Sequence, residues 1–316
     1  MTYNFQRYLT AKKSVDDRSL NRYVLDTLHG ALPVRSGAPP LHMLEIGCGI
    51  GTMLERLLER QVITCGLYTG LDVDGLNIAE TRRRLVAWAA KRGIDVEDRK
   101  TDLRLRSEKV SLQVRLQQAD VLEFCARGAA RNAYDLVIAS AFMDLVDVFD
   151  LLPRMCRLLR PNGLLYLALN FDGETILLPE IDPEQDHRII ETYHASMDRM
   201  TATGRPAGGR DTGRKLLPLL GQSGTEILAA GSSDWILWPK AAGYTPDEAY
   251  FLHFITHTIE LELRGRSQID SVLLEDWIRR RHRQIDRGEL TFIAKQLDCL
   301  ARAPAREDKG GILKLR

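Results

Sequence analysis

A glycine-rich turn is the clearest chemical signal in the sequence. Gly47, Gly49 and Gly51 alternate with other residues directly after a predicted apolar strand (residues 41–46), and a predicted helix begins at Thr52. Glycine allows a sharp backbone turn and the close approach of a ligand, because it has no Cβ. The first N–H groups of the helix carry partial positive charge, which suits a carboxylate or a phosphate. The turn is therefore a predicted ligand-binding loop.

Two acidic residues stand close to this loop in the predicted fold. Glu45 stands two residues before the first glycine, and Asp72 follows the predicted second strand (residues 68–71). A carboxylate at the end of a second strand can accept hydrogen bonds from both ribose hydroxyls. A dinucleotide fingerprint would place its third glycine at position 52, where Thr52 stands instead, so the spacing weighs against an NAD-binding loop.

Later motifs follow in the order of a known family. Asp120 and Val121 follow the predicted third strand, Tyr134–Ser140 has the apolar character of a central fourth strand, and a Pro-Asn-Gly turn leads into a fifth. Together with the glycine loop and Asp72, these motifs resemble the class I S-adenosylmethionine-dependent methyltransferases over residues 41–169. The resemblance implies a Rossmann-like α/β fold and S-adenosyl-L-methionine as the cofactor.

The resemblance also implies which residues bind the cofactor. It places Glu45 and the glycines at the methionine end, Asp72 on the ribose, and Asp120 with the Val121 backbone on the adenine. The complete set that it implies is Glu45, Gly47, Cys48, Gly49, Gly51, Asp72, Val73, Asp120, Val121 and Ser140.

Alternating strand and helix segments predict an α/β fold with a doubly wound, mostly parallel sheet. The resemblance implies seven strands in the order 3-2-1-4-5-7-6, with an antiparallel final pair at residues 226–230 and 235–238. The third strand (residues 111–117) alternates apolar and polar residues, which predicts one buried face and a position at the sheet edge. Residues 246–302 are predicted to be helical, apart from short breaks.

These patterns divide the chain into three predicted parts. Residues 1–40 form an N-terminal helical segment that we expect to act as a lid. Residues 41–240 form the methyltransferase domain, with a substrate insertion at about residues 170–213. Residues 241–316 form a helical C-terminal extension.

Candidate catalytic residues are few, because methyl transfer mainly requires donor and acceptor to be held in line and water to be excluded. A general base is needed only when the acceptor must lose a proton. Asp144 follows the fourth strand and is a candidate for orienting an acceptor hydroxyl or amine, although a loop or helix-capping role also fits it. His187 and His194 lie in the predicted insertion helix and are candidate bases, although a surface or packing role is the simpler interpretation.

Charged residues of the insertion offer further candidates. Asp172 and Glu174 follow the fifth strand and face either the substrate or a turn. Arg210 and Arg214 lie in and after a glycine-rich loop, where they suit either an anionic group of the acceptor or the surface of a flexible loop.

No metal site is predicted. His253 and His257 have a spacing that allows shared ligation on a helix, but Phe254 stands where an H-E-x-x-H motif has its glutamate. The five cysteines are scattered and form no Cys-x-x-Cys pair, which favours a reducing compartment and argues against disulfides and structural zinc.

The charge balance narrows the class of partner. The 316 residues include 44 Lys and Arg against 43 Asp and Glu, a formal net charge of +1, which gives no overall field for gripping nucleic acid or an anionic membrane. No apolar run approaches the roughly 20 residues that a membrane helix requires. We expect a cytoplasmic protein, monomeric or homodimeric, with a small-molecule methyl acceptor and neither nucleic acid nor membrane as partner.

Three alternatives remain open from the sequence. The first is a sensor or regulatory protein that binds S-adenosylmethionine without transferring the methyl group. The second is an NAD-dependent oxidoreductase on a similar sheet, which NAD binding would reveal. The third is a nucleic-acid methyltransferase, whose binding would fall steeply with salt.

Overall fold

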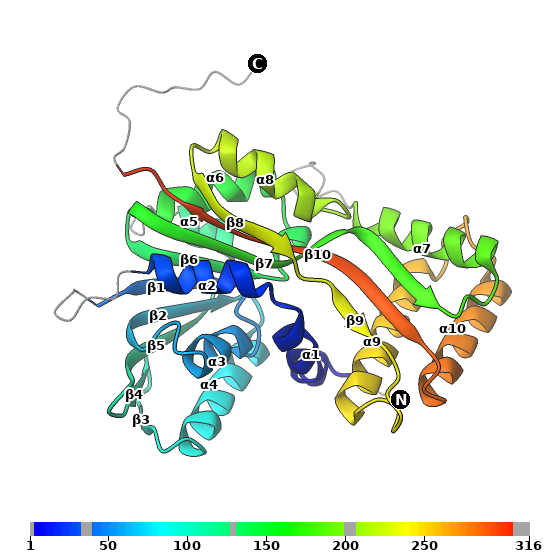
Figure 1. Cartoon of the computed structure of the whole chain (residues 1–316), viewed down its shortest axis with the longest axis horizontal. Coiled ribbons are helices and arrows are strands. Elements are labelled where there is room, and N and C mark those ends of the chain that lie inside the picture. Colours follow the sequence, from blue (N-terminus) through cyan, green and yellow to red (C-terminus); the bar gives the residue numbers. More distant parts are fainter. Residues whose placement is uncertain (1–2, 33–39, 127–130, 199–206, 306–316) are drawn as a thin grey trace.

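One mixed sheet of ten strands organises the fold, with helices on both of its faces (Figure 1). The computed structural model describes residues 3–32, 40–126, 131–198 and 207–305. The strands follow the order β3-β4-β5-β2-β1-β6-β7-β10-β8, and β9 also pairs with β10. Their bounds are β1 (His42–Ile46), β2 (Cys65–Asp72), β3 (Asp95–Asp98), β4 (Leu103–Arg106), β5 (Ser111–Gln118), β6 (Tyr134–Ser140), β7 (Leu159–Leu178), β8 (Glu226–Ser232), β9 (Trp235–Leu237) and β10 (Thr291–Arg302).

Most helices begin at a side chain that accepts a hydrogen bond from their first turn, as N-cap residues do. Asp147 accepts from the backbone of Phe149 and Asp150, and Thr245 forms a capping box with Glu248. The helices are α1 (Phe5–Ser19), α2 (Arg22–Ala31), α3 (Thr52–Glu59), α4 (Gly75–Ala90), α5 (Val121–Ala126), α6 (Val148–Leu158), α7 (Pro183–Met197), α8 (Thr212–Gln222), α9 (Pro246–Leu263) and α10 (Ser271–Asp286), with a 3-10 turn η1 (Met143–Leu145).

Seven strands reproduce the predicted order. The sequence β5-β2-β1-β6-β7-β10-β8 corresponds to 3-2-1-4-5-7-6, with β5, β2, β1, β6 and β7 parallel and β10 antiparallel to its neighbours. The predicted doubly wound α/β class is confirmed. The predicted count of seven strands is wrong, because β3, β4 and β9 enlarge the sheet.

The predicted helix over residues 246–302 is wrong in its last part. The helices α9 and α10 form there, but Thr291–Arg302 is the strand β10, which lies between β7 and β8 in the seventh position of the family order. The residues predicted for that position, 235–238, form only the short β9. The segment 241–316 therefore contributes a strand to the main sheet as well as helices.

Two buried polar residues explain why the sequence pattern did not predict the strand β10. Gln296 and Asp298 interrupt its apolar pattern, yet both are almost fully buried. The carboxylate of Asp298 accepts hydrogen bonds from the backbone N–H groups of Leu169, at 2.7 Å, and Asn21, at 2.9 Å. Such partners make a buried carboxylate tolerable, and they depend on contacts that a local pattern does not contain.

The predicted edge position of the third strand is also wrong. In β4, Leu103 and Leu105 point into the core while Arg104 and Arg106 lie toward solvent, so β4 pairs along β5 and covers it. The outermost strand is β3, which lies in a strongly charged segment and pairs with β4. The alternation of apolar and polar residues in 111–118 indicates that one face of the sheet is exposed there. It does not indicate whether another strand pairs with β5.

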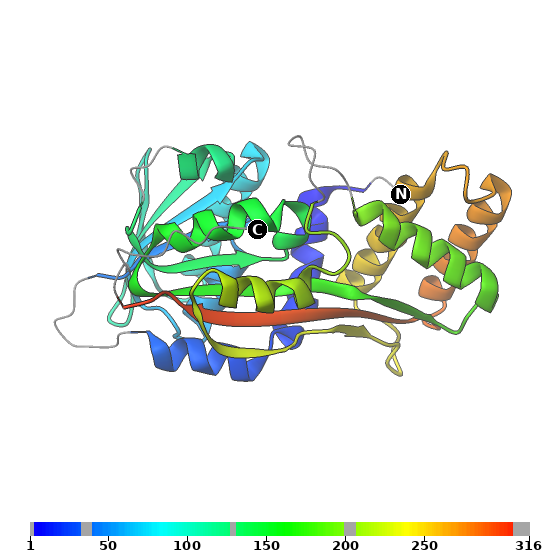
Figure 2. The ribbon, with the colours of Figure 1, turned by 90° about the horizontal axis from the view of Figure 1, so that it is seen from above.

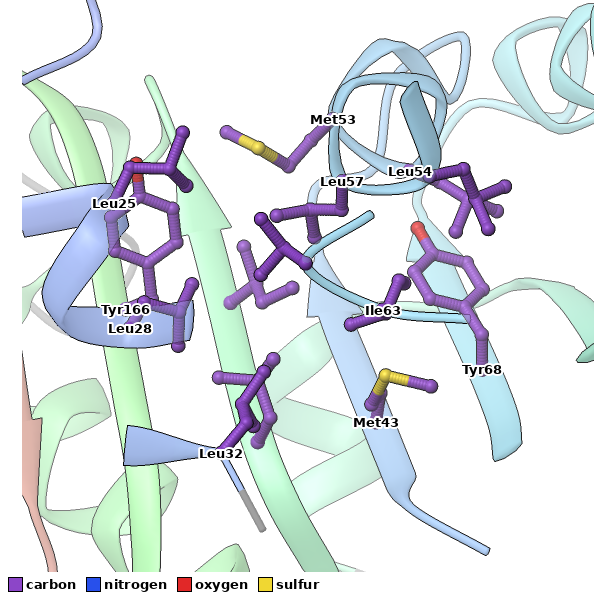
Figure 3. Packing of buried hydrophobic residues seen from close by; sticks show 14 of the residues in the cluster. Leu25, Leu28, Leu32, Met43, Met53, Leu54, Leu57, Ile63, Tyr68 and Tyr166 are labelled. Atoms are coloured by element: carbon purple, nitrogen blue, oxygen red, sulfur yellow. The ribbon is translucent and has the colours of Figure 1, made fainter. Parts of the chain in front are cut away.

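Two apolar layers enclose the parallel part of the sheet. The helices α2, α3 and α4 cover one face, and α5, α6 and α8 cover the other. Figure 3 shows the first layer, in which Leu25 and Leu28 of α2 and Leu57 of α3 meet Tyr166 of β7 and Met43 of β1. Burial of these side chains provides the main driving force for the layered arrangement.

A second core forms where β7 and β10 continue beyond the sheet. Figures 1 and 2 show these two strands running side by side into a group made of α7, α9 and α10, with α1 between this group and the sheet. The second core includes Phe251 of α9, Trp277 of α10, Phe292 of β10 and Tyr8 of α1. The long strand pair thus joins both halves of the molecule.

Leu57→Ala should destabilise the protein strongly. Leu57 is fully buried between α2, α3 and the sheet, so the substitution removes apolar burial and leaves a cavity. We expect the free energy of unfolding to fall by roughly 2–5 kcal/mol in urea denaturation. The control, Leu261→Ala, changes a leucine that is 56% exposed and should shift stability by no more than about 0.5 kcal/mol. Equal effects of the two substitutions would contradict this packing.

Candidate active site

A cavity of about 680 Å³ lies at the carboxyl ends of β1, β2, β6 and β7. This edge of a parallel α/β sheet is where such folds bind ligands, and the volume is typical of small-molecule sites. The glycine loop and the ends of β2, β5 and β6 line one part of the cavity. Aromatic side chains from α1, α7, α9, β7 and β10 line the rest, which is called the aromatic chamber below.

The glycine loop has a conformation that its residue types require. Gly47 and Gly51 have φ angles of +65° and +78°, which side chains with a Cβ rarely adopt. A Cβ on Gly47 would lie 2.4 Å from the ring of Phe142, and one on Gly51 would lie 2.7 Å from Thr81. The loop therefore keeps its backbone close to the neighbouring elements and to the cavity.

Asp72 connects β2 to the glycine loop. Its Oδ2 accepts a hydrogen bond from the Gly49 N–H at 2.9 Å, and its Oδ1 accepts from the Asp74 N–H at 2.9 Å and from the Asn77 side chain at 3.2 Å. A carboxylate has further lone pairs, so these contacts fix its orientation and leave it able to accept hydroxyl groups. Asp72 lines the cavity in the position predicted for a ribose ligand.

Glu45 is a buried acid beneath the loop. It is 2% exposed, and its Oε2 accepts a hydrogen bond from the Tyr68 hydroxyl at 2.5 Å. Burial raises the pKa of Glu45 to about 8, and this effect outweighs the Tyr68 hydrogen bond and the attraction of Arg56, which act in the opposite direction. A cation bound near Glu45 would favour its ionised form, and the carboxylate could then serve as the counter-ion.

Asp120 and Val121 mark the far end of this part of the cavity. Oδ1 of Asp120 accepts hydrogen bonds from the backbone N–H groups of Leu122 and Glu123, which fixes the start of α5. Asp120 is exposed and lines the cavity, so its carboxylate has further lone pairs available to a ligand. Ser140 lies at the end of β6 and also lines the cavity.

The structure brings nine of the ten predicted cofactor residues to the cavity wall. These nine are Glu45, Gly47, Cys48, Gly49, Asp72, Val73, Asp120, Val121 and Ser140. Gly51 is absent from the wall. It is the N-cap residue of α3, and its N–H donates a hydrogen bond to the Cys48 carbonyl within the turn.

Comparison with known proteins identifies this part of the chain. Residues 44–165 match the family model of a methyltransferase domain. A protein from Bacillus halodurans assigned as a methyltransferase is similar in structure with a TM-score of 0.50 and 12% identity, covering 89% of this chain and 98% of that chain. The match of residues 44–165 to a methyltransferase domain is consistent with the class I resemblance found in the sequence.

More distant similarities extend over most of the chain. A cyclopropane synthase from Mycobacterium tuberculosis gives a TM-score of 0.43 at 13% identity, covering 88% of this chain and 82% of that one. Geranyl diphosphate C-methyltransferase from Streptomyces coelicolor A3(2) gives 0.42 at 12% identity, with 89% and 78% covered. The comparison with curated proteins found no match to this chain.

The cofactor of this methyltransferase family is S-adenosylmethionine, and the residues of the cavity fit it. The Glu45 carboxyl suits the amino group, the Asp72 carboxylate suits the ribose hydroxyls, and Asp120 with Val121 suits the adenine. The loop itself shows the fit: a Cβ at Gly47 or Gly51 would meet a neighbouring side chain, so only glycine lets the backbone come this close.

The aromatic chamber adjoins the glycine loop and is built by segments far apart in the sequence. Its walls include rings from α1, β7, α7, β9, α9 and β10 and from Phe142, the residue before η1. These residues are Phe5, Tyr8, Phe142, Phe171, Tyr193, Trp235, Phe254 and Phe292. Tyr8 and Phe254 stack with ring centres 4.1 Å apart, which joins α1 to α9. The chamber is therefore suited to an apolar ligand.

Helix α1 lies over the cavity, where the sequence predicted a lid. Leu9 approaches the glycine loop, and Lys12 and Asp16 line the chamber. Arg56 of α3 is almost completely buried and contacts Asp16 and Asp17, which holds α1 against the methyltransferase domain. The burial of these charges is compensated by pairing.

Asp144 is the second acid of the chamber wall, in addition to Asp16. It lies in η1, directly after the end of β6, and lines the cavity. Its Oδ1 is buried and has no hydrogen-bond partner among the described residues. Burial raises the pKa of Asp144, although its own backbone N–H and the charge of Lys12 act to lower it.

The two candidate histidines have different positions. His194 is buried behind the wall, where its Nε2 lies 3.0 Å from Oγ1 of Thr175, and burial lowers its pKa. Thr175 lines the chamber, so His194 reaches the cavity only through that hydroxyl. His187 is exposed on α7 and does not line the cavity, so the structure gives no support to its prediction as a base.

The charged candidates of the insertion are paired with each other or with neighbours. Arg214 contacts Asp172 at 2.8 Å, and Arg210 contacts Asp198 at 2.8 Å. Glu174 forms an ion pair with Lys295. The part of the glycine-rich loop before residue 207 lies outside the described residues.

The histidine pair of α9 lies outside the cavity. His253 Nδ1 is 2.7 Å from Nδ1 of His282, and His257 stacks on Tyr3 with ring centres 4.3 Å apart. Within the described ranges, no group of three or more His, Cys, Asp or Glu residues has a geometry that could hold a metal ion. Nor does any described helix have the length and apolar character to cross a membrane.

Sequence reasoning missed most of the chamber. Lys12, Trp235, Phe292 and Gln296 line it, and none of them stands in a recognisable motif. The sequence offers one signal, the aromatic residues Tyr3, Phe5 and Tyr8 near its start. The others come together only through the long pairing of β7 with β10.

Glu45→Gln should change how stability depends on pH. With a pKa raised from 4.5 to about 8, the native state holds a proton that the unfolded state releases, so Glu45 lowers stability as pH rises between these values. Glutamine can still accept from Tyr68 and has no proton to lose. The stability of the variant relative to the parent should rise by up to about 4 kcal/mol between pH 5 and pH 9, measured by urea denaturation.

The matched control for this measurement is Glu108→Gln, which changes an exposed glutamate. Its stability should follow the parent protein at every pH. A Glu45→Gln variant whose pH profile is parallel to that of the parent would show that Glu45 is ionised in the native protein.

Proposed function

We propose that the protein transfers the methyl group of S-adenosylmethionine to a small, largely apolar organic molecule. The observation that carries the proposal is one cavity that runs from the glycine loop into the aromatic chamber. The first part fits the cofactor, and the second part offers apolar walls to an acceptor beside it. A protein that only senses the cofactor has no need of this adjoining chamber.

The chain's own residues contribute mainly orientation and exclusion of water. When bound, S-adenosylmethionine supplies a methyl group on a positively charged sulfur, which is a good leaving group. Asp72 and the glycine loop orient the ribose and the methionine end, and their mutual hydrogen bond fixes both before a ligand arrives. Helix α1 and the aromatic walls keep water from the reacting atoms.

Asp144 is the candidate proton acceptor of the chamber, because the other acid in this wall, Asp16, is paired with Lys12 and Arg56. Its Oδ1 is buried without a partner among the described residues. Asp144 lies in η1, which follows β6, and β6 pairs with β1, the strand that leads into the glycine loop. A general base must lie within reach of the proton that it removes. We place Asp144 in that role, with His194 behind Thr175 as a residue that orients the wall.

A small-molecule acceptor agrees with the charge of the cavity. Lys12 is the one cationic residue among the described residues that line it, and it is paired with Asp16 at 2.6 Å. Nucleic acid would require a series of unpaired basic residues for its phosphates.

Calorimetric titration tests the cofactor directly. The purified protein should bind S-adenosylmethionine and S-adenosylhomocysteine, and it should not bind NAD. Binding of NAD alone would support the oxidoreductase alternative. Tight binding of S-adenosylmethionine without methylation across a broad panel of acceptors would favour the sensor.

Asp72→Ala should weaken the binding of S-adenosylmethionine by roughly 1.5–3 kcal/mol. The substitution removes the acceptor of the ribose hydroxyls and releases the Gly49 N–H. The control, Asp276→Ala, changes a partly exposed aspartate of α10 that does not line the cavity, and it should leave the dissociation constant unchanged. An unchanged affinity in folded Asp72→Ala protein, checked by thermal unfolding, would reject the assignment of Asp72.

A further inference from the structure

We propose that the methyl acceptor is an apolar amine, whose nitrogen is bound and deprotonated by Asp144 in the aromatic chamber. The inference deepens the proposed function and rests on it, because it concerns the acceptor of the same methyl transfer. Three observations carry it: an unpartnered carboxylate oxygen, the aromatic side chains that line the same cavity, and the charge balance of the wall.

The first observation is the Asp144 carboxylate. A buried oxygen without a hydrogen bond is costly, so native structures almost always provide a partner for it. Oδ1 of Asp144 has none among the described residues, and Asp144 lines the cavity. A ligand with an N–H or O–H donor would supply the missing partner.

Gln296 adds a second group of this kind. It is 3% exposed, it lines the chamber from β10, and its Oε1 is also buried without a partner. The wall therefore presents two side chains that can accept hydrogen bonds. Ligands that are acceptors only, such as ethers, leave both groups unsatisfied.

The second observation is the number of aromatic side chains in the wall of the chamber. The chamber includes Tyr8, Phe142, Phe171, Trp235 and Phe254. Aromatic faces carry partial negative charge and attract a cation within about 6 Å of the ring centre. They also bury the apolar part of a ligand, so one wall suits both parts of an apolar ammonium ion.

The third observation is the charge balance. Lys12 is poorly placed to pair with an anionic ligand, because its Nζ already forms an ion pair with Asp16 and lies 4.8 Å from the centre of the Trp235 ring. The Trp235 indole N–H donates to the other oxygen of Asp16 at 3.0 Å. With this pair neutral, the charge of the chamber depends on Asp144, whose ionised form burial disfavours when nothing is bound. An ammonium group beside Asp144 would stabilise the ionised carboxylate, whereas an alcohol brings no charge and a carboxylate brings a like charge.

The proposed reaction is balanced. The bound ammonium passes one proton to the Asp144 carboxylate, which leaves a lone pair on nitrogen. That lone pair forms the new N–C bond to the methyl group as the C–S bond breaks, and the electrons of the broken bond remain on sulfur. The products are the methylated ammonium ion and neutral S-adenosylhomocysteine, and the proton on Asp144 returns to solvent.

Binding to the full-length protein saturated with S-adenosylhomocysteine tests the proposal. The probes are 2-phenylethylamine, tryptamine and cyclohexylmethylamine, each compared in calorimetry with the alcohol of the same skeleton, and 3-phenylpropanoate serves as the anionic probe. At pH 7 we expect at least one amine to bind about tenfold or more tightly than its alcohol, because a hydrogen bond to a charged group is stronger. The preferred amine should then yield an N-methylated product with S-adenosylmethionine, detected by mass spectrometry.

Two variants test whether Asp144 causes the preference for the amine over the alcohol. Asp144→Asn should reduce the preference for the amine to about the level of the alcohol, while thermal unfolding shows that it is folded. Asp276→Asn, at a partly exposed position of α10, should keep the full preference. An amine preference that survives in Asp144→Asn would overturn the role of Asp144.

The outcomes separate this inference from the proposed function. Failure of S-adenosylhomocysteine to bind would remove the cofactor and the function with it. If S-adenosylhomocysteine binds but the alcohols or 3-phenylpropanoate bind as well as the amines, or no amine binds, then the amine inference alone is overturned. The comparison of amine with alcohol uses the unaltered protein, so it decides the question even if Asp144→Asn does not fold.

Discussion

The antiparallel pairing of β7 with β10 is the constraint on which both halves of the active site depend. Between Leu164 and Asn170, β7 is a central strand of the sheet that positions the glycine loop. Beyond Phe171 the same two strands leave the sheet and carry the floor of the aromatic chamber. Cofactor site and chamber therefore share one backbone element, and a shift in its register would displace one relative to the other.

The sequence predicted the parts of the fold that local patterns determine. Continuous apolar runs such as Tyr134–Ser140 indicate central strands, and the order of strands and helices indicates a doubly wound sheet. The position of β10 was not predictable in this way, because Asp298 is tolerated inside the sheet only through the backbone donors of Leu169 and Asn21. Those donors lie more than 120 residues away along the chain, beyond the reach of any periodicity.

The same division applies to the active site. The cofactor half rests on a short motif, since Glu45 and the glycines lie within seven residues and Asp72 follows the next strand, and sequence reasoning located it. The chamber has no motif. Its residues come from α1, α7, α9 and β10, and each of them stands in a sequence context typical of an ordinary amphipathic element. Such a site becomes visible only when tertiary contacts are known.

The hairpin of β3 and β4 has a consequence for association between molecules. An outermost strand offers unpaired backbone N–H and C=O groups to any other extended chain, which makes it a site of aggregation. Here that strand is only four residues long, and Asp95, Glu97 and Asp98 bring negative charge along it. A second copy that approached the same edge would meet acidic side chains at three of the four residues of β3. The hairpin therefore covers β5 with apolar residues on its inner side and protects the sheet from growing by further strands at this end.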